Sequence, residues 1–113
     1  MDFNNLKFFN EIDCAITICD ENFIIMYMND KAKKTFEKYG NCIGKSLLNC
    51  HNENSVNLIK KMITNGEKNI YTISKDGIKK LIYQTPWYNN GKIAGLIEFS
   101  FEIPDNIQHF NRN

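Results

Sequence analysis

Apolar and polar residues follow two different periods along this chain of 113 residues. Spacing of three and four residues, which is typical of amphipathic helices, occurs at the N-terminus and again in the middle of the chain. Runs of β-branched and aromatic residues lie between these two segments and fill the last third, where apolar and polar positions alternate. The pattern predicts a helix, two strands, a helical middle and a final group of strands.

The first predicted element, residues 1–12, is a short amphipathic helix. Its apolar groups recur at helical spacing, and they include Leu6, Phe8, Phe9 and Ile12. These side chains could cover the sheet of their own chain or form a dimer interface with a second copy, and the sequence leaves both open. Two apolar runs follow at 14–19 and 23–28, and the polar stretch Asp20-Glu21-Asn22 between them predicts a β-hairpin.

Two helices are predicted in the middle of the chain. The first has Asn29 as its N-cap, apolar residues on one face, and Gly40 as its end. The second is expected to start after Asn54 and to stop at Gly66. Residues 42–53 between them show little periodicity, so short helical turns are expected there.

Three strands are predicted after residue 68, at 70–75, 78–88 and 92–103. The turn sequences Lys75-Asp76-Gly77 and Asn89-Asn90-Gly91 between them favour tight hairpins. Pro86 has no backbone N–H, so its strand should be bulged there or lie at an edge.

In the last of these strands, apolar and polar residues alternate, so each kind occupies its own face. Ile97, Phe99, Phe101 and Ile103 share one face, opposite Glu98, Ser100 and Glu102. One face of the sheet should therefore be buried and the other partly solvated. The order of elements indicates an α+β domain over residues 13–104, with helices across one face of a five-stranded sheet, and a polar tail over 105–113.

Composition limits the function further. The 14 basic and 13 acidic side chains give a net charge of +1, so neither nucleic acid nor a membrane surface is expected as a partner. The longest apolar run, residues 23–28, is too short to span a bilayer. The N-terminus has no signal-peptide pattern, so a cytoplasmic location is expected.

Site chemistry is sparse. The four cysteines, Cys14, Cys19, Cys42 and Cys50, contain no C-x-x-C pair and are expected to be reduced. A zinc site of Cys42, Cys50 and His51 is not expected, because a structural site needs four ligands in tightly spaced pairs. With only two histidines, no Ser/His/Asp or Cys/His/Asn set is available, so no enzyme activity is expected.

Several short motifs, taken in order, resemble a PAS domain. They are Asn29 with Ala32 one turn later, Gly44-Lys45-Ser46, Thr85-Pro86, Asn90-Gly91 and Gly95-Leu96-Ile97-Glu98. The pair Cys50-His51 before the long helix is similar to a subgroup of PAS domains that are often joined to haemerythrin-like domains. The resemblance implies a five-stranded antiparallel sheet in the order 2-1-5-4-3, and a role in sensing.

As a PAS-like chain, the protein is expected to bind a small ligand between the sheet and the long helix and to relay the signal through a homodimer or a partner protein. The expected pocket residues are Phe36, Tyr39, Leu47, Cys50, His51, Ile59, Ile63 and Trp87. A ligand-free interaction module, dimerising through the N-terminal helix, is the alternative.

His51 is the strongest candidate for chemistry, because an imidazole can ligate haem iron. A non-covalent haem sensor is thus a further alternative, while covalent attachment would need a C-x-x-C-H motif that the chain lacks. Flavin is not expected, since His51 replaces the arginine of the flavin-attaching Asn-Cys-Arg segment and the strands are interpreted as lacking suitable amide side chains. The ligand itself stays unidentified.

Overall fold

The computed structural model describes residues 3–113, although the side chains of residues 3–5 and of Cys50 lie outside the described part. The chain forms the elements η1 (Phe3–Phe9), β1 (Ala15–Asp20), β2 (Ile25–Met28), α1 (Asp30–Thr35), η2 (Glu37–Tyr39), η3 (Leu47–Cys50), α2 (Glu53–Asn65), β3 (Asn69–Lys75), β4 (Ile78–Asn89) and β5 (Lys92–Glu102), where η marks a 3-10 helix.

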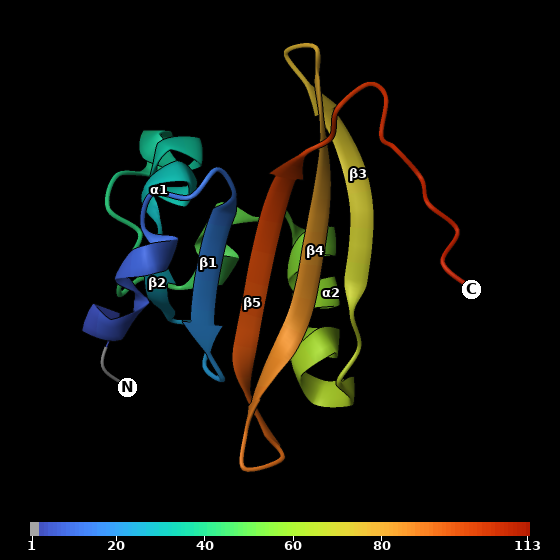
Figure 1. Cartoon of the computed structure of the whole chain (residues 1–113). Helices are drawn as coiled ribbons and strands as arrows, with labels where there is room; N and C mark the ends of the chain where they lie inside the picture. The colour runs from blue at the N-terminus through green and yellow to red at the C-terminus, as the bar shows by residue number, and fades with distance from the viewer. Residues whose placement is uncertain (1–2) are drawn as a thin grey trace.

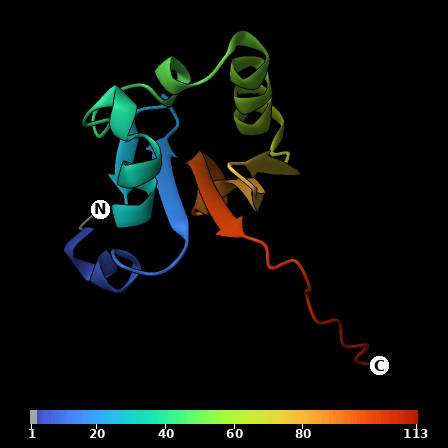
Figure 2. The same ribbon diagram turned by 90° about the horizontal axis from the view of Figure 1, so that it is seen from above.

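The strands form one antiparallel sheet in the order β2-β1-β5-β4-β3. Helix α2 lies behind β3, β4 and β5 (Figure 1), and the view from above places η1 on the other side of the sheet (Figure 2). The α+β class and the strand order predicted from the sequence are therefore confirmed.

Both predicted turns of the C-terminal meander are present. Asp76 and Gly77 have φ angles of 54° and 77°, and Asn90 and Gly91 have φ angles of 52° and 80°. Positive φ at both central residues defines the type I′ turn, whose twist matches that of the flanking strands. Asn, Asp and Gly are the residues that reach this region most easily, which is why the sequence signal was reliable.

Pro86 lies in a central strand without breaking it. Strand β3 begins at Asn69, which pairs with Gln84, so the part of β4 that contains Pro86 has a strand on one side only. A register shift also follows between Trp87 and Tyr88. Both the bulge and the local edge expected around a strand proline are thus present.

The first hairpin has a wider turn than the sequence suggested. The Asp20 carboxylate accepts hydrogen bonds from the backbone N–H groups of Asn22 and Ile24, at 2.9 and 3.0 Å. These bonds hold Phe23 at a φ of 65° and delay the start of β2 to Ile25, two residues later than predicted.

The helical middle also differs in detail. Asn29 caps α1 as predicted, but the helix stops at Thr35 and a separate 3-10 turn, η2, follows before Gly40. Helix α2 is capped by Asn52, whose side chain accepts from the N–H of Ser55 at 2.9 Å, so the prediction of Asn54 was wrong by two residues. Gly66, with a φ of 71°, ends α2 as expected.

Apolar side chains pack on both faces of the sheet. The main core lies between the sheet and the helices α1, η3 and α2, and it includes Cys19, Ile25, Ala32, Leu47, Ile59 and Leu96. On the opposite face, which we call the outer face, Leu6 and Phe9 of η1 pack against Ile16 and Tyr27. The N-terminal helix therefore covers the sheet of its own chain, although Phe8 stays 66% exposed and Ile12 is also exposed.

No helix in the described part of the chain is long and apolar enough to cross a bilayer.

Candidate ligand-binding site

A row of polar side chains crosses the helix-facing surface of the sheet, which we call the inner face. Asn69 of β3 pairs with Gln84 of β4, Gln84 pairs with Glu98 of β5, and Glu98 pairs with Thr17 of β1. Paired residues of antiparallel strands point to the same face, so these four side chains form one line across the sheet. The inner face is thus apolar near α1 and polar toward β3.

Three members of this row are joined by hydrogen bonds. Asn69 Nδ2 donates to Gln84 Oε1 at 3.0 Å, and Gln84 Nε2 donates to Glu98 Oε2 at 2.6 Å. We call Asn69, Gln84 and Glu98 the amide ladder. Gln84, at its centre, is only 5% exposed, and its buried amide is hydrogen-bonded to a half-buried partner on each side.

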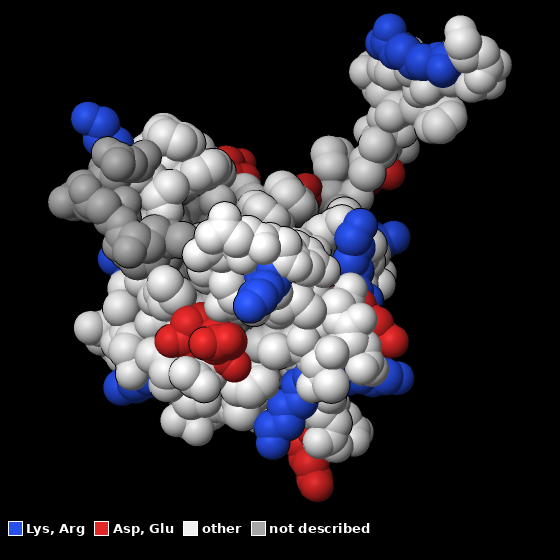
Figure 3. All heavy atoms as spheres, turned by 90° about the horizontal axis from the view of Figure 1, so that it is seen from below, with Lys and Arg blue, Asp and Glu red and all other residues white. Residues whose placement is uncertain are grey.

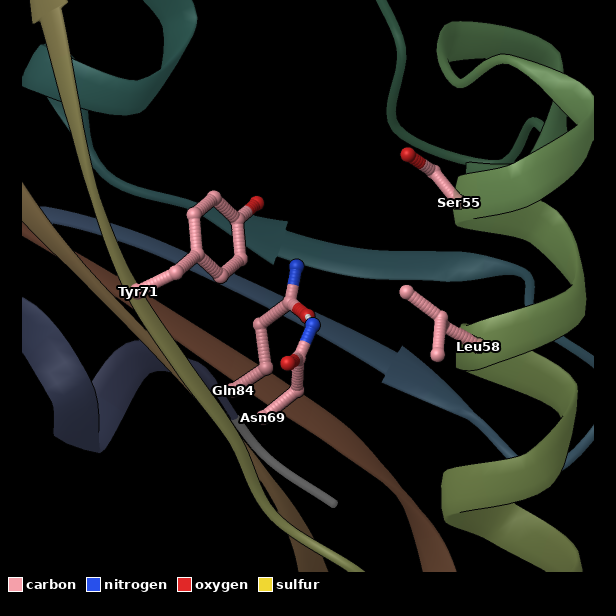
Figure 4. Close-up of a pocket in the computed structure, with 5 residues that line it drawn as sticks. All are labelled: Ser55, Leu58, Asn69, Tyr71 and Gln84. Atoms are coloured by element: carbon pink, nitrogen blue, oxygen red, sulfur yellow. Dashed lines mark hydrogen bonds between the residues drawn. The ribbon is translucent and has the colours of Figure 1, made fainter.

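A groove of about 350 Å³ lies between this ladder and α2. Ser55 and Leu58 point into it from α2, and Tyr71, Asn69 and Gln84 face them from the sheet (Figure 4). The volume falls within the range of about 300–1,000 Å³ that small-molecule sites occupy. The groove therefore combines an apolar wall, a tyrosine ring and a polar floor.

A second cavity, of about 240 Å³, adjoins the first and shares Tyr71 with it. It is lined by Ala15, Thr17, Thr35, Phe36, His51, Tyr71, Ile73, Lys75, Lys80, Ile82, Glu98 and Ser100. The Nδ1 atom of His51 lies 2.9 Å from the carbonyl oxygen of Leu47. A carbonyl only accepts, so Nδ1 carries the hydrogen and Nε2 holds the lone pair of the neutral ring.

The negative charge of Glu98 helps to raise the pKa values of other groups on the inner face. The pKa of Tyr71 is raised, first by burial and then by the Glu98 carboxylate, so its hydroxyl stays protonated and able to donate. Burial raises the pKa of Cys19 to about 11, and Glu98 adds a small contribution. Cys14 and Cys42 are also buried, so the described cysteines are packing residues.

The structure distributes the sequence-predicted pocket residues over several environments. Leu47 and Ile59 are buried in the main core, and Phe36 and Ile63 pack against it. The space that Leu47 and Ile59 line is only about 10 Å³, the size of one water molecule at most.

The remaining predicted residues are separated. Phe36 and His51 line the second cavity, while Tyr39 is 42% exposed. Strand alternation places Trp87 on the face opposite Gln84, where its Nε1 donates to the Cys19 carbonyl oxygen at 2.9 Å. The side chain of Cys50 lies outside the described part. Among the described members of the set, Phe36 and His51 therefore share the second cavity, Leu47 and Ile59 share the small space in the core, and the others lie apart.

The residues that line the groove were not predicted from the sequence: Ser55, Leu58, Asn69, Tyr71 and Gln84. The available signal was the set of polar residues within otherwise apolar strands, at positions that the hairpin turns bring into register. The interpretation that the strands lack suitable amide side chains was wrong, because Asn69 and Gln84 both present amides on the inner face. Among the described residues, no three His, Cys, Asp or Glu side chains come together as a metal ion would require.

Comparison with known families and structures gives a consistent result. The sequence model of a family described as PAS domain matches residues 5–104. No curated protein matches the sequence. A C-terminal domain from Streptococcus mutans is 18% identical, with a TM-score of 0.72 over 90% of this chain and 85% of that chain. The PAS domain of histidine kinase ThkA is 22% identical, with a TM-score of 0.65 over 80% of this chain and 99% of that one.

VqmA of Vibrio cholerae has a similar fold. It has been solved with a ligand and DNA; that structure is 20% identical, with a TM-score of 0.67 over 94% of this chain and 53% of that chain. VqmA bound to DPO is 19% identical, with the same TM-score, over 92% and 58% of the two chains. This chain thus spans a little over half of VqmA.

The expectation that excluded nucleic acid as a partner was wrong. VqmA shares this fold and binds DNA, so balanced charge in a domain of this type does not exclude such a partner. The net charge of a chain does not show whether one part of its surface can bind DNA. Basic and acidic side chains are interspersed on the face of this chain seen in Figure 3.

Proposed function

Because the chain belongs to the PAS domain family, we propose that it is a sensory module that binds a small ligand in the groove between α2 and the inner face of the sheet. The observation that carries this proposal is the groove of about 350 Å³, whose floor contains Asn69 and the buried Gln84 of the amide ladder. Binding sites typically combine apolar walls with a few converging polar groups, and this groove does so. The proposed role is binding, without catalysis.

The two walls of the groove suggest how binding would be transmitted. Ser55 and Leu58 belong to the first half of α2, while Asn69, Tyr71 and Gln84 belong to the sheet. A ligand that contacts both walls favours one spacing between them, and it shifts the population toward that arrangement. The altered surface would then be recognised by another domain or chain.

VqmA offers a parallel, since it has been solved bound to DPO. At 19% identity the likeness shows the fold alone, so the ligand of this chain has to be sought directly.

Haem remains the second candidate, because His51 Nε2 is left with a lone pair at the edge of a cavity. The lining of that cavity includes Lys75, Lys80 and Glu98, which makes it more polar than an apolar haem slot. The first proposal is therefore favoured.

Native mass spectrometry of protein purified from its own host tests the proposed function. The variant Leu58→Trp would fill the groove, and Asn57→Trp, one position along the same helix and exposed, is the matched control. We expect a bound small molecule in the wild type and in Asn57→Trp, and none in Leu58→Trp. A wild type without any bound molecule would favour the ligand-free interaction module instead, and a molecule retained in Leu58→Trp would place binding elsewhere.

A further inference from the structure

A cleft of about 360 Å³ lies between α1 and the turn that joins β3 to β4, separate from the groove beside α2. Its lining contains four lysines from three elements: Lys31 and Lys34 of α1, Lys75 of β3 and Lys80 of β4. Two carboxylates, those of Asp76 and Glu102, share the lining. Four positive and two negative charges leave the cleft with a net charge of +2.

One of these four lysines is already paired with carboxylates. Lys31 Nζ forms an ion pair with Asp13 and a second one with Glu102, at 3.4 Å. The other three lysines form no ion pair with any residue in the described part of the chain. Glu102 is the residue that pairs with Lys80 across β4 and β5, but its carboxylate is engaged by Lys31. The net positive charge therefore belongs to the three unpaired lysines.

Strand register directs two of the unpaired lysines toward α1. Lys80 pairs with Ile73, and Lys75 follows Ile73 by two residues, so all three lie on the inner face. Lys80 is half-buried there. A half-buried ammonium group loses part of its hydration, and an anion bound beside it would offset that loss. The fold thus holds positive charge at a place where a bound anion is favourable.

The type of basic residue indicates which anion fits. The planar guanidinium of arginine matches a planar carboxylate through two parallel hydrogen bonds, whereas the lysine ammonium is a compact charge without a preferred plane. Three ammonium groups that come from three different elements suit an anion whose oxygens point in several directions, as those of a phosphate do. A terminal phosphate group carries close to two negative charges near neutral pH, which balances the charge of the cleft.

We propose that this cleft binds the terminal phosphate group of a small soluble compound, held by Lys34, Lys75 and Lys80. The two carboxylates in the lining confine the positive region to a small space, which suits a small molecule. The cleft shares Thr35, Lys75 and Lys80 with the second cavity, which leaves room for the uncharged part of the compound. This site goes beyond the proposed function, since it lies outside the groove.

Methyl phosphate and dimethyl phosphate form a matched pair of probes, because near a pH of about 7.5 the monoester carries close to two negative charges and the diester carries one. Titration of the full chain at low salt, followed by ¹H–¹⁵N NMR, gives both dissociation constants. The backbone amide signals of residues 30–35 and 75–80 report the location. We expect methyl phosphate to bind at least about fivefold more tightly. Malonate divides its two charges between two carboxylates and should bind more weakly than methyl phosphate.

Replacing single lysines by glutamine tests which of them hold the phosphate. Lys80→Gln, at the half-buried position, should weaken the binding of methyl phosphate by about fivefold to tenfold, and Lys34→Gln by about threefold. Lys79→Gln and Lys33→Gln are the matched controls. Each removes the same charge one position along the same element, from a lysine that does not line the cleft, and should change the affinity by less than about 1.5-fold.

Glu102→Gln should produce the opposite change. It removes a negative charge from the lining and one of the two carboxylate partners of Lys31, so methyl phosphate should bind about threefold more tightly. A substitution that only loosened the fold would weaken binding instead.

Equal dissociation constants for methyl phosphate and dimethyl phosphate would overturn the inference, and so would the absence of methyl phosphate binding. Malonate binding as tightly as methyl phosphate would overturn the assignment to phosphate. An equal loss of affinity in Lys79→Gln and Lys80→Gln would also overturn it, because it would indicate a general attraction to basic surface in place of a site.

Discussion

Replacing Asn29 by alanine should destabilise the domain more than any other single loss of a polar side chain. Asn29 is 1% exposed, and its side chain makes four hydrogen bonds. Its Oδ1 accepts from the N–H groups of Ile16 at 3.0 Å and Ala32 at 3.1 Å, and its Nδ2 donates to the carbonyls of Phe9 at 3.0 Å and Cys14 at 2.6 Å. One side chain thereby joins η1, β1 and α1.

The expected magnitude follows from the number of buried groups left without a partner. A hydrogen bond contributes about 1 kcal/mol net, and an orphaned buried group costs about 1–3 kcal/mol. Four backbone groups lose their partner in Asn29→Ala, and some of them can rearrange, so a loss of about 4 kcal/mol is expected. A domain of this size has a free energy of unfolding of about 5–15 kcal/mol, so the variant should be near the limit of folding at 37 °C.

Urea unfolding, followed by the fluorescence of the single tryptophan, measures this loss. With a slope of about 2 kcal/mol per molar urea, the midpoint should fall by about 2 M. Asn52→Ala is the matched control: it removes the same side chain from an exposed N-cap that makes one bond, and it should cost about 1 kcal/mol. A midpoint shift in Asn29→Ala no larger than that of Asn52→Ala would refute the reasoning.

Three further predictions concern packing, alkaline stability and haem. Gly95→Ala would place a methyl group 1.9 Å from the Cys19 carbonyl oxygen and 2.6 Å from Trp87 Nε1, so urea unfolding should show a loss above about 3 kcal/mol, against about 1 kcal/mol for Gly91→Ala in its open turn. The pKa of Cys19 is raised from 9.0 to about 11, so the unfolded thiol ionises first and the free energy of unfolding should fall by about 2 kcal/mol as the pH rises from 9 to 11; Cys19→Ala should lack this fall. If His51 ligates haem, haemin-treated protein should show a Soret band that is shifted or lost in His51→Ala, and identical spectra would exclude that ligand.

The role of Asn29 shows where sequence reasoning succeeds and where it stops. Capping depends on the few residues that follow, so the N-cap position of Asn29 could be predicted from the local pattern. Its bonds to Phe9 and Cys14 join segments 15 and 20 residues away, and no periodicity reports them. The same limit explains the cap of α2, since Asn52 and Asn54 are equivalent locally and only the folded backbone selects Asn52.

In the last strand, the sequence predicts which residues share a face but not which face of the sheet they occupy. Alternation correctly separates Ile97, Phe99 and Phe101 from Glu98 and Ser100, but it does not say which row faces the helices. The structure turns the polar row toward α2 and the apolar row toward η1 and the outer face. Apolar residues such as Leu47 and Ile59 were therefore predicted to line the pocket, whereas these two are buried in the main core.

The position of the groove along α2 decides which end of the helix a ligand would move. Ile59 and Met62 fix the later turns of α2 in the main core, and Gly66 ends the helix against Tyr88 and Ile93. Ser55 and Leu58, which face the groove, lie in the earlier turns next to η3. A bound ligand would thus act on the end of α2 that the core holds least, and the signal should leave through the η3 to α2 junction, while the sheet and its hydrogen-bonded register stay fixed.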